Sequence, residues 1–295
     1  MTDLSDRVSR FGLKPEPELL AESARGDGLH CVLKIELAGR PLVLKVYGRK
    51  RDRLRDFLRD VGHRVLIGKT GMTPLARRRT VRETLALWRA HGFDVPATVD
   101  APLPATVPPN HLLCEFVPGR LLHLVIADRS VPLAEKSRLL ATLAREWSRR
   151  HALALALREP RLIQSHAFLG HVIHVAAGTR KDGGDSGERL VTFDFEVAWA
   201  RRAAIPRLIS LELAQQFDSL TKWAPREQFE SLLASFVRAY PERPRLERMP
   251  ADVRSGRLPL LAPITRLGLA LRERGPGRKR AMLAAFEQAL RETRT

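Results

Sequence analysis

The stretch Leu42-Val-Leu-Lys-Val-Tyr47 places a lysine in an alternating apolar segment. The alternation predicts a β-strand, because successive side chains of a strand point to opposite faces of a sheet. Leu42, Leu44 and Val46 would share one face, and Lys45 would lie on the other. An ammonium group among apolar neighbours on a half-buried face needs a charged partner. The sequence therefore predicts an acidic residue near Lys45.

The candidate for this partner is Glu83, and a second acidic residue, Asp194, follows much later in the sequence. Glu83 lies in the segment Thr80–Trp88, whose apolar residues recur at helical spacing. Asp194 lies in the apolar, strand-like segment Val191–Glu196. Each feature also has a simpler explanation, since a strand lysine can lie on a solvated sheet edge and an aspartate can end a strand. Their order favours a site that handles nucleotide phosphates and a metal ion.

The composition predicts a globular protein with a strongly basic surface. Of the 295 residues, 44% are hydrophobic, and the net charge is +18. This charge is consistent either with a solvated arginine-rich surface or with attraction to phosphate-rich partners. No apolar segment approaches the ~18 residues that a membrane span needs, and the first residues lack the apolar core of a signal peptide. We expect a cytoplasmic protein, with peripheral contact at the inner membrane face allowed by the basic charge.

Basic residues concentrate in segments 49–55 and 76–79. Such runs form either the solvated face of a helix or a surface for an anionic saccharide or an anionic membrane. Aromatic residues are not interleaved with them, so nucleic acid is not an expected partner. Cys31 and Cys114 lie in apolar segments and are predicted to be buried, reduced thiols.

The order of predicted elements indicates an α+β protein with two lobes. Strands are expected at 29–37, 42–47, 95–100 and 111–117, with a helix at 80–91. This N-terminal lobe, residues 1–117, carries Glu83 on its one helix. The C-terminal lobe, residues 118–295, is expected to be mostly helical, with a hairpin around Asp194 and additional helices at the end of the chain.

Together, Lys45, Glu83, the segment 113–119, the loop 164–171 and the motif Asp194-Phe-Glu196 resemble the protein-kinase-like superfamily. Within it, they are most similar to the lipopolysaccharide core kinases. These enzymes phosphorylate heptose or Kdo sugars at the cytoplasmic face of the inner membrane. The resemblance extends over residues 25–220 and implies a bilobal fold, ATP and Mg²⁺ as cofactors, and a sugar hydroxyl as acceptor.

The resemblance assigns roles to individual residues. Lys45 would hold the α- and β-phosphates of ATP, and Glu83 would orient it. The backbone groups of Glu115 and Val117 would contact the adenine ring. Asp194 would hold Mg²⁺, a cation that prefers carboxylate oxygens and takes few protein ligands. His171 falls at the position of the second metal ligand of this family.

The loop Gln164-Ser-His-Ala-Phe-Leu-Gly-His171 departs from the His-Arg-Asp-like triplet of the family at all three positions, which are Gln164, Ser165 and His166 here. His166 stands where these kinases carry the aspartate that orients the acceptor hydroxyl. A neutral imidazole can accept a proton near neutral pH, and phosphoryl transfer depends mainly on positioning and charge stabilisation. Two functions therefore remain open: a phosphotransferase with His166 as an atypical base, and a catalytically degenerate pseudokinase that binds nucleotide or acts as a scaffold. A nucleic-acid-associated role is a third class with less support, and the sequence indicates no oligomeric state.

Overall fold

A computed structural model describes residues 9, 11–22, 30–48, 57–58, 60–178, 187–200, 205–254 and 276–293. The chain divides into two compact units. The first comprises residues 1–118 and 191–197, and the second comprises residues 119–190 and 198–295. The segment 191–197 thus belongs to the first unit, whereas the predicted lobes assigned it to the C-terminal half. The basic segment 49–55 lies outside the described residues.

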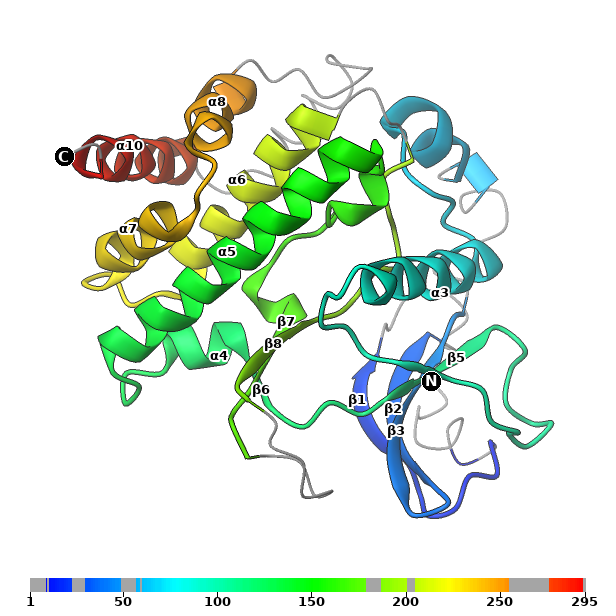
Figure 1. Ribbon diagram of the computed structural model, residues 1–295. Coiled ribbons are helices and arrows are strands. Elements are labelled where there is room, and N and C mark those ends of the chain that lie inside the picture. Colours follow the sequence, from blue (N-terminus) through cyan, green and yellow to red (C-terminus); the bar gives the residue numbers. More distant parts are fainter. Residues whose placement is uncertain are drawn as a thin grey trace. The chain divides into compact units, whose positions relative to one another are not determined.

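The first unit is built on an antiparallel five-stranded sheet with the strand order β1-β2-β3-β5-β4 (Figure 1). The strands are β1 (Glu18–Glu22), β2 (Cys31–Leu37), β3 (Arg40–Val46), β4 (Thr98–Val99) and β5 (His111–Glu115). The turn between β2 and β3 uses positive φ angles at Ala38 and Gly39, which a tight hairpin requires.

Strand β3 alternates as its sequence predicts. Leu42, Leu44 and Val46 are buried, whereas Lys45 is only partly buried. The buried side chains join one apolar cluster that includes residues from β2 and β5 and from the chain before β1. Its members are Phe11, Cys31, Leu33, Ile35, Leu42, Leu44, Val46, Val107 and Leu113. The core thus fixes one face of β3 and leaves Lys45 on the other.

Helix α3 (Pro74–Ala90) lies beside the sheet within the first unit (Figure 1). It begins six residues earlier than predicted, because Thr73 caps it by accepting a hydrogen bond from the Ala76 amide at 3.3 Å. Pro74 at the first helical position suits this start, since its missing amide has no role there. The helix ends before Gly92, which has a φ of +71°. Its buried stripe contains the predicted Val81, Leu85 and Trp88, together with Arg77, Thr80 and Thr84.

The second unit is mostly helical. Helix α5 (Leu133–Leu157) packs with α6 (Ile205–Trp223) and α7 (Phe229–Ala239), and α8 (Arg243–Arg254) and α10 (Pro276–Glu292) pack against α6 (Figure 1). A small sheet has the order β6-β7-β8. Its strands are β6 (Arg120–Leu121), β7 (Val172–Val175) and β8 (Arg189–Thr192). Short helices of the described residues are α4 (Leu122–Ala127), η1 (Gly62–Ile67), η2 (Pro160–Leu162) and η3 (Leu169–His171).

The predicted α+β class, with a β-rich first part and a mostly helical second part, is confirmed. One local prediction is wrong: the strand expected across Val191–Glu196 ends at Thr192. Asp194 adopts a left-handed backbone with a φ of +68°, which breaks the extended conformation that a strand needs. Among the described helices, none combines the length and the apolar character required to cross a bilayer.

Candidate functional site

The first unit brings the Lys45 ammonium group between two carboxylates. Lys45 Nζ lies 2.8 Å from Asp194 Oδ1 and 3.0 Å from Glu196 Oε1. The Lys45 side chain is 16% exposed, Glu196 is 14% exposed, and Asp194 is 32% exposed. Asp194 therefore presents the most accessible carboxylate of the group. The predicted convergence of Lys45 and Asp194 is what the structure shows.

Glu196 connects Lys45 to a second cation. Its Oε2 accepts a hydrogen bond from Arg77 Nη1 at 3.3 Å, and its Oε1 lies 3.3 Å from His30 Nε2. Arg77 is almost fully buried and also donates to the carbonyl of Gly48. Its guanidinium group lies over the Tyr47 ring at 5.6 Å from the centroid. A buried guanidinium with an acidic partner and a carbonyl partner fixes Glu196 in place.

These contacts set the protonation of the cluster. Burial alone would lower the pKa of Lys45, but the adjacent Asp194 and Glu196 carboxylates more than offset it and raise the pKa above its ordinary value. Lys45 is therefore a permanent cation over the physiological range. Burial raises the pKa of the Tyr47 phenol in the same cluster. Its hydroxyl is buried and has no hydrogen-bond partner among the described residues.

The position of Asp194 and Glu196 follows from the residue between them. Phe195 is buried and packs on Trp88 of α3, with ring centroids 4.7 Å apart. The amide of Thr192 donates to the carbonyl of Asp94 at 2.9 Å, which also attaches this segment to the first unit. The left-handed backbone of Asp194 is unusual for a residue other than glycine, although aspartate tolerates it better than most. Two attachment points thus hold both carboxylates at Lys45.

Glu83 is not placed as the sequence predicts. Its Oε1 accepts a hydrogen bond from Arg79 Nε at 2.6 Å, one turn earlier on α3, and 43% of its side chain is exposed. The helix explains this: six residues separate Arg77 from Glu83, so their side chains point about 120° apart around the axis. Glu196 occupies the place beside Lys45 that Glu83 was expected to take.

Sequence reasoning missed Glu196, Arg77 and His30 as members of the cluster. Two features of the sequence could have indicated Glu196 and Arg77. Glu196 follows Asp194 by two residues, so both acids can face the same way across a buried Phe195. Arg77 extends the apolar stripe of Val81 and Leu85 by one turn, and an arginine on a buried stripe needs a buried acid. His30 carried no comparable signal.

The segment predicted to contact adenine leaves β5 at the end of the first unit. The Glu115 amide donates to the carbonyl of Ala97 at 2.9 Å. The structure gives the Val117 amide no hydrogen-bond partner among the described residues. Cys114 precedes them as a free, half-buried thiol, and burial raises its pKa to about 11. Cys31 and Cys114 are both free thiols, and Cys31 is buried as predicted, whereas Cys114 is only half-buried.

In the second unit, helix α6 holds the loop that contains His166. Glu212, Gln215 and Ser219 accept hydrogen bonds from the amides of Gln164, Ala167 and Leu169 at 2.8, 2.9 and 3.1 Å, respectively. The three acceptors are spaced so that they lie along one side of the helix. The loop backbone is therefore anchored at three points, on both sides of His166.

The histidines of this loop differ in their surroundings. His166 is exposed, and its Nδ1 lies 3.1 Å from the hydroxyl of Ser165. His171 donates from Nδ1 to the carbonyl of His166 at 2.8 Å. His174 pairs with Glu188 at 2.8 Å. In the part of the chain that the structure describes, no three histidine, cysteine or acidic side chains are grouped as a metal site. Asp194 belongs to the first unit and His171 to the second, so a metal site shared by the two stays a prediction.

A buried ionic network supports the start of the loop. Glu212 accepts from Arg150 Nη2 at 2.8 Å, and its other oxygen lies 2.6 Å from His151 Nε2. All three side chains are buried, and His151 Nδ1 contacts the Tyr240 hydroxyl at 2.7 Å. Burial lowers the pKa of His151 to about 4, although Glu212 opposes this shift. Burial would raise the pKa of Glu212, but Arg150 and His151 hold it below its ordinary value. The network is thus a neutral imidazole beside an ion pair.

Comparison with known proteins yields similarity only among solved structures. No protein-family model matches the chain, and no curated protein matches it. WaaP in complex with acyl carrier protein is 16% identical, with a TM-score of 0.47, and the similarity covers 99% of this chain and 93% of that one. The ADP/Mg²⁺-phosphoaspartate complex of the Rio2 kinase from Chaetomium thermophilum is 15% identical, with a TM-score of 0.39 and coverages of 99% and 74%. A microcompartment-associated aminopropanol kinase is 11% identical, with a TM-score of 0.36 and coverages of 98% and 95%.

Proposed function

We propose that this protein is an ATP- and Mg²⁺-dependent phosphotransferase of the kinase-like superfamily, acting on a hydroxyl group of a sugar or of a lipopolysaccharide-like saccharide. One observation carries the proposal: Lys45 Nζ lies within 3.0 Å of both Asp194 and Glu196, which are far from it in the sequence. A fixed cation beside an accessible carboxylate is the arrangement that binds nucleotide phosphates together with a divalent metal ion.

The residues of the cluster fit Mg²⁺. This ion prefers oxygen ligands, keeps several waters and is bound by one or two carboxylates plus substrate phosphates. Asp194 is the accessible carboxylate and would hold the ion, while Glu196 is fixed by Arg77 and would keep Lys45 aimed at the phosphates. When bound, Mg²⁺ would neutralise charge on the transferred phosphoryl group. Lys45 supplies a second positive charge and retains it at every relevant pH.

The adenine ring would bind at the end of β5. The Val117 amide has no hydrogen-bond partner among the described residues, so a ring nitrogen of adenine could accept from it. The Glu115 amide already donates to the carbonyl of Ala97. Glu115 would therefore bind adenine through its own carbonyl, which would accept a hydrogen bond from the adenine amino group. This division of roles keeps Glu115 and Val117 as nucleotide-binding residues through their backbones.

His166 would act on the acceptor hydroxyl. Its side chain is exposed on a loop whose backbone is anchored by α6, which suits a residue that contacts substrate better than a packed structural histidine. A neutral imidazole at this position would accept the hydroxyl proton as the oxygen attacks the γ-phosphorus. The bond from that phosphorus to the β-phosphate oxygen breaks, and ADP leaves with the electron pair.

The alternative is a degenerate kinase-like module that binds nucleotide without transferring phosphate. The sequence of the loop favours it, because no carboxylate occurs from Gln164 to His171. Such a protein would keep the Lys45 cluster and use nucleotide to stabilise a scaffold.

Turnover of ATP separates the two functions. We expect the wild-type chain to hydrolyse or transfer the γ-phosphate, and His166→Ala to lower kcat by about 10²-fold or more, since general-base catalysis contributes about 10²–10⁴-fold. ADP affinity should change less than about twofold, because the role proposed for His166 is toward the acceptor hydroxyl and not toward the nucleotide phosphates. Equal inactivity of wild type and His166→Ala, with activity gained only by His166→Asp, would identify the degenerate module instead.

A further inference from the structure

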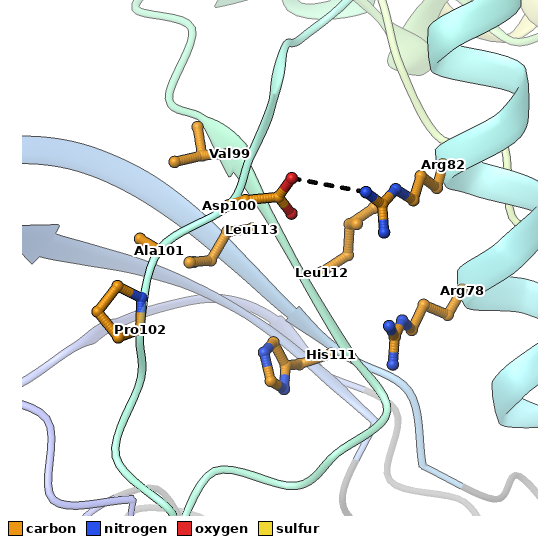
Figure 2. Close-up of a pocket in the computed structure, with 9 residues that line it drawn as sticks. All are labelled: Arg78, Arg82, Val99, Asp100, Ala101, Pro102, His111, Leu112 and Leu113. Carbon is orange, nitrogen blue, oxygen red and sulfur yellow. Dashed lines mark ion pairs between the residues drawn. The ribbon is translucent and has the colours of Figure 1, made fainter.

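The first unit contains a cavity that shares no residue with the Lys45 cluster (Figure 2). Its volume is about 360 Å³, within the range of small-molecule sites. Two arginines of α3, Arg78 and Arg82, border it on one side. The opposite side is formed by β5 and by the chain that follows β4, including His111 and the apolar residues Val99 and Leu112.

The three arginines of segment 77–79 have three different environments. Arg77 is buried against Glu196, Arg79 is exposed and paired with Glu83, and Arg78 points into the cavity. Arg78 Nη1 donates to the carbonyl of Pro109 at 2.8 Å, which holds its guanidinium group at the rim. The basic run is therefore not one uniform solvated face, and only one of its members is available to this cavity.

The charges of the cavity are incompletely balanced. Arg82 lies one helical turn after Arg78, so both side chains project to the same side. The acid that lines the cavity, Asp100, has its Oδ2 3.5 Å from Arg82 Nη2, and 89% of its side chain is exposed (Figure 2). An exposed pair at this distance contributes little stability. Two guanidinium groups thus face a cavity in which one weakly held carboxylate is present.

His111 adds a third nitrogen-bearing side chain. Its Nδ1 donates to the carbonyl of Pro108 at 2.7 Å, which fixes the ring and makes Nε2 the nitrogen left for a ligand. Figure 2 shows the Arg78 side chain directed from α3 toward the part of the chain that carries His111. Val99 and the buried Leu112 also line the cavity and give it apolar surface.

We propose that this cavity binds a phosphate monoester that carries a small apolar group. A monoester has a charge of about −1.5 to −2 near neutral pH, which matches two guanidinium groups. Guanidinium groups bind phosphate oxygens in a bidentate manner, and the apolar surface would contact the organic part of the ester. The ligand displaces Asp100 from Arg82, since the two anions compete for the same cation. The site does not depend on nucleotide binding at Lys45.

Phenyl phosphate is the probe, titrated by calorimetry into the full chain and into a Lys45→Met variant that lacks the phosphate-binding cation of the other cluster. We expect saturable binding to both. Arg82→Gln should weaken binding by about tenfold or more, since one bidentate contact is lost. Asp100→Asn should strengthen it several-fold by removing the competing anion. Arg79→Gln is the matched control on the same helix and should change affinity by less than about twofold.

Absence of saturable binding, or equal affinity of wild type and Arg82→Gln, would overturn the proposal. The exposed positions of Arg82 and Asp100 make loss of folding an unsuitable explanation for either variant. The source of the ester is resolved with vesicles of phosphatidylcholine, with or without phosphatidic acid. If the protein sediments with the vesicles that contain phosphatidic acid, and phenyl phosphate prevents this sedimentation, the ligand is a lipid headgroup. Binding of phenyl phosphate without sedimentation assigns it to a soluble phosphorylated metabolite.

Discussion

Glu196 is the residue on which the Lys45 cluster depends. It contacts Lys45 at 3.0 Å, accepts from Arg77 at 3.3 Å, and lies 3.3 Å from His30. Removing one carboxylate charge from such a cluster leaves the buried Arg77 with an incompletely compensated charge. The carboxylates beside Lys45 are therefore supplied by the segment after β8 and not by α3.

Substitution of Glu196 and Glu83 by glutamine tests this assignment. Glu196→Gln should weaken MgADP binding by about tenfold or more, because Lys45 loses one of its two anionic partners and becomes less well oriented. Glu83→Gln should change the dissociation constant by less than about twofold, since its partner is the exposed Arg79. Calorimetric titration of both variants measures the difference. A large loss of affinity in Glu83→Gln alone would return the orienting role to α3.

At the residue scale, the sequence was sufficient to predict that Lys45 and Asp194 lie close together. It was insufficient to predict the other residues that contact them. An alternating strand with a lysine on its less buried face predicts a nearby acid, but it does not identify which one. Glu83 was the predicted partner of Lys45, and the helical rotation that turns it away depends on which face of α3 packs. In the structure, the buried face of α3 is the one that carries Arg77.

At the scale of single elements, α6 determines the geometry of the loop 164–169. Its acceptors Glu212, Gln215 and Ser219 bind three amides of the loop. The sequence predicted a mostly helical C-terminal lobe, but polar residues within a helix are ordinarily assigned to its solvated face. Glu212 and Ser219 are instead buried, because the loop has amides that no regular element satisfies.

The buried His151 gives the second unit a pH-dependent stability. Its folded-state pKa, lowered by burial to about 4, lies below the ordinary value near 6.5 that it regains on unfolding. The unfolded chain therefore binds the extra proton first, and stability falls as pH decreases from about 6.5 toward 4. We expect this histidine to contribute a loss of about 1 kcal/mol between pH 7 and 5.5.

Denaturant unfolding of wild type and His151→Phe at pH 7 and 5.5 measures this contribution. The Phe variant lacks the titrating group, so its unfolding free energy should fall less over this interval. Glu212 does not affect this comparison. Its folded-state pKa lies below the ordinary value of 4.5, so its contribution to the unfolding free energy is lost only below that pH. Parallel pH dependences in the two proteins would show that folding does not lower the pKa of His151.

At the scale of the whole molecule, the sequence predicted the α+β class and the order of most elements, but not that residues 191–197 belong to the first unit. Local patterns carry no information about docking over such a separation. The docking arises from particular contacts, above all Phe195 on Trp88 and the hydrogen bond from Thr192 to Asp94. Those contacts place Asp194 and Glu196 beside Lys45 within a single unit.

The basic residues that give the chain its net charge of +18 lie in different environments. Arg77 and Arg150 are buried in ion pairs, whereas Arg78 and Arg82 border a cavity. Part of the basic character that suggested a solvated surface is thus used inside the protein. A count of charges from composition cannot separate these environments, because burial depends on which acids the fold brings near.

Calorimetric titration of MgADP into wild type and Asp194→Asn tests the central claim most directly. Asparagine tolerates the left-handed backbone of this position, so the substitution removes the carboxylate charge with little change in conformation. We predict that wild type binds one ADP with an affinity that rises when Mg²⁺ is present, and that the variant loses this dependence on Mg²⁺. Failure of wild type to bind MgADP, or equal Mg²⁺ dependence in both proteins, would contradict a nucleotide site built from Lys45, Asp194 and Glu196.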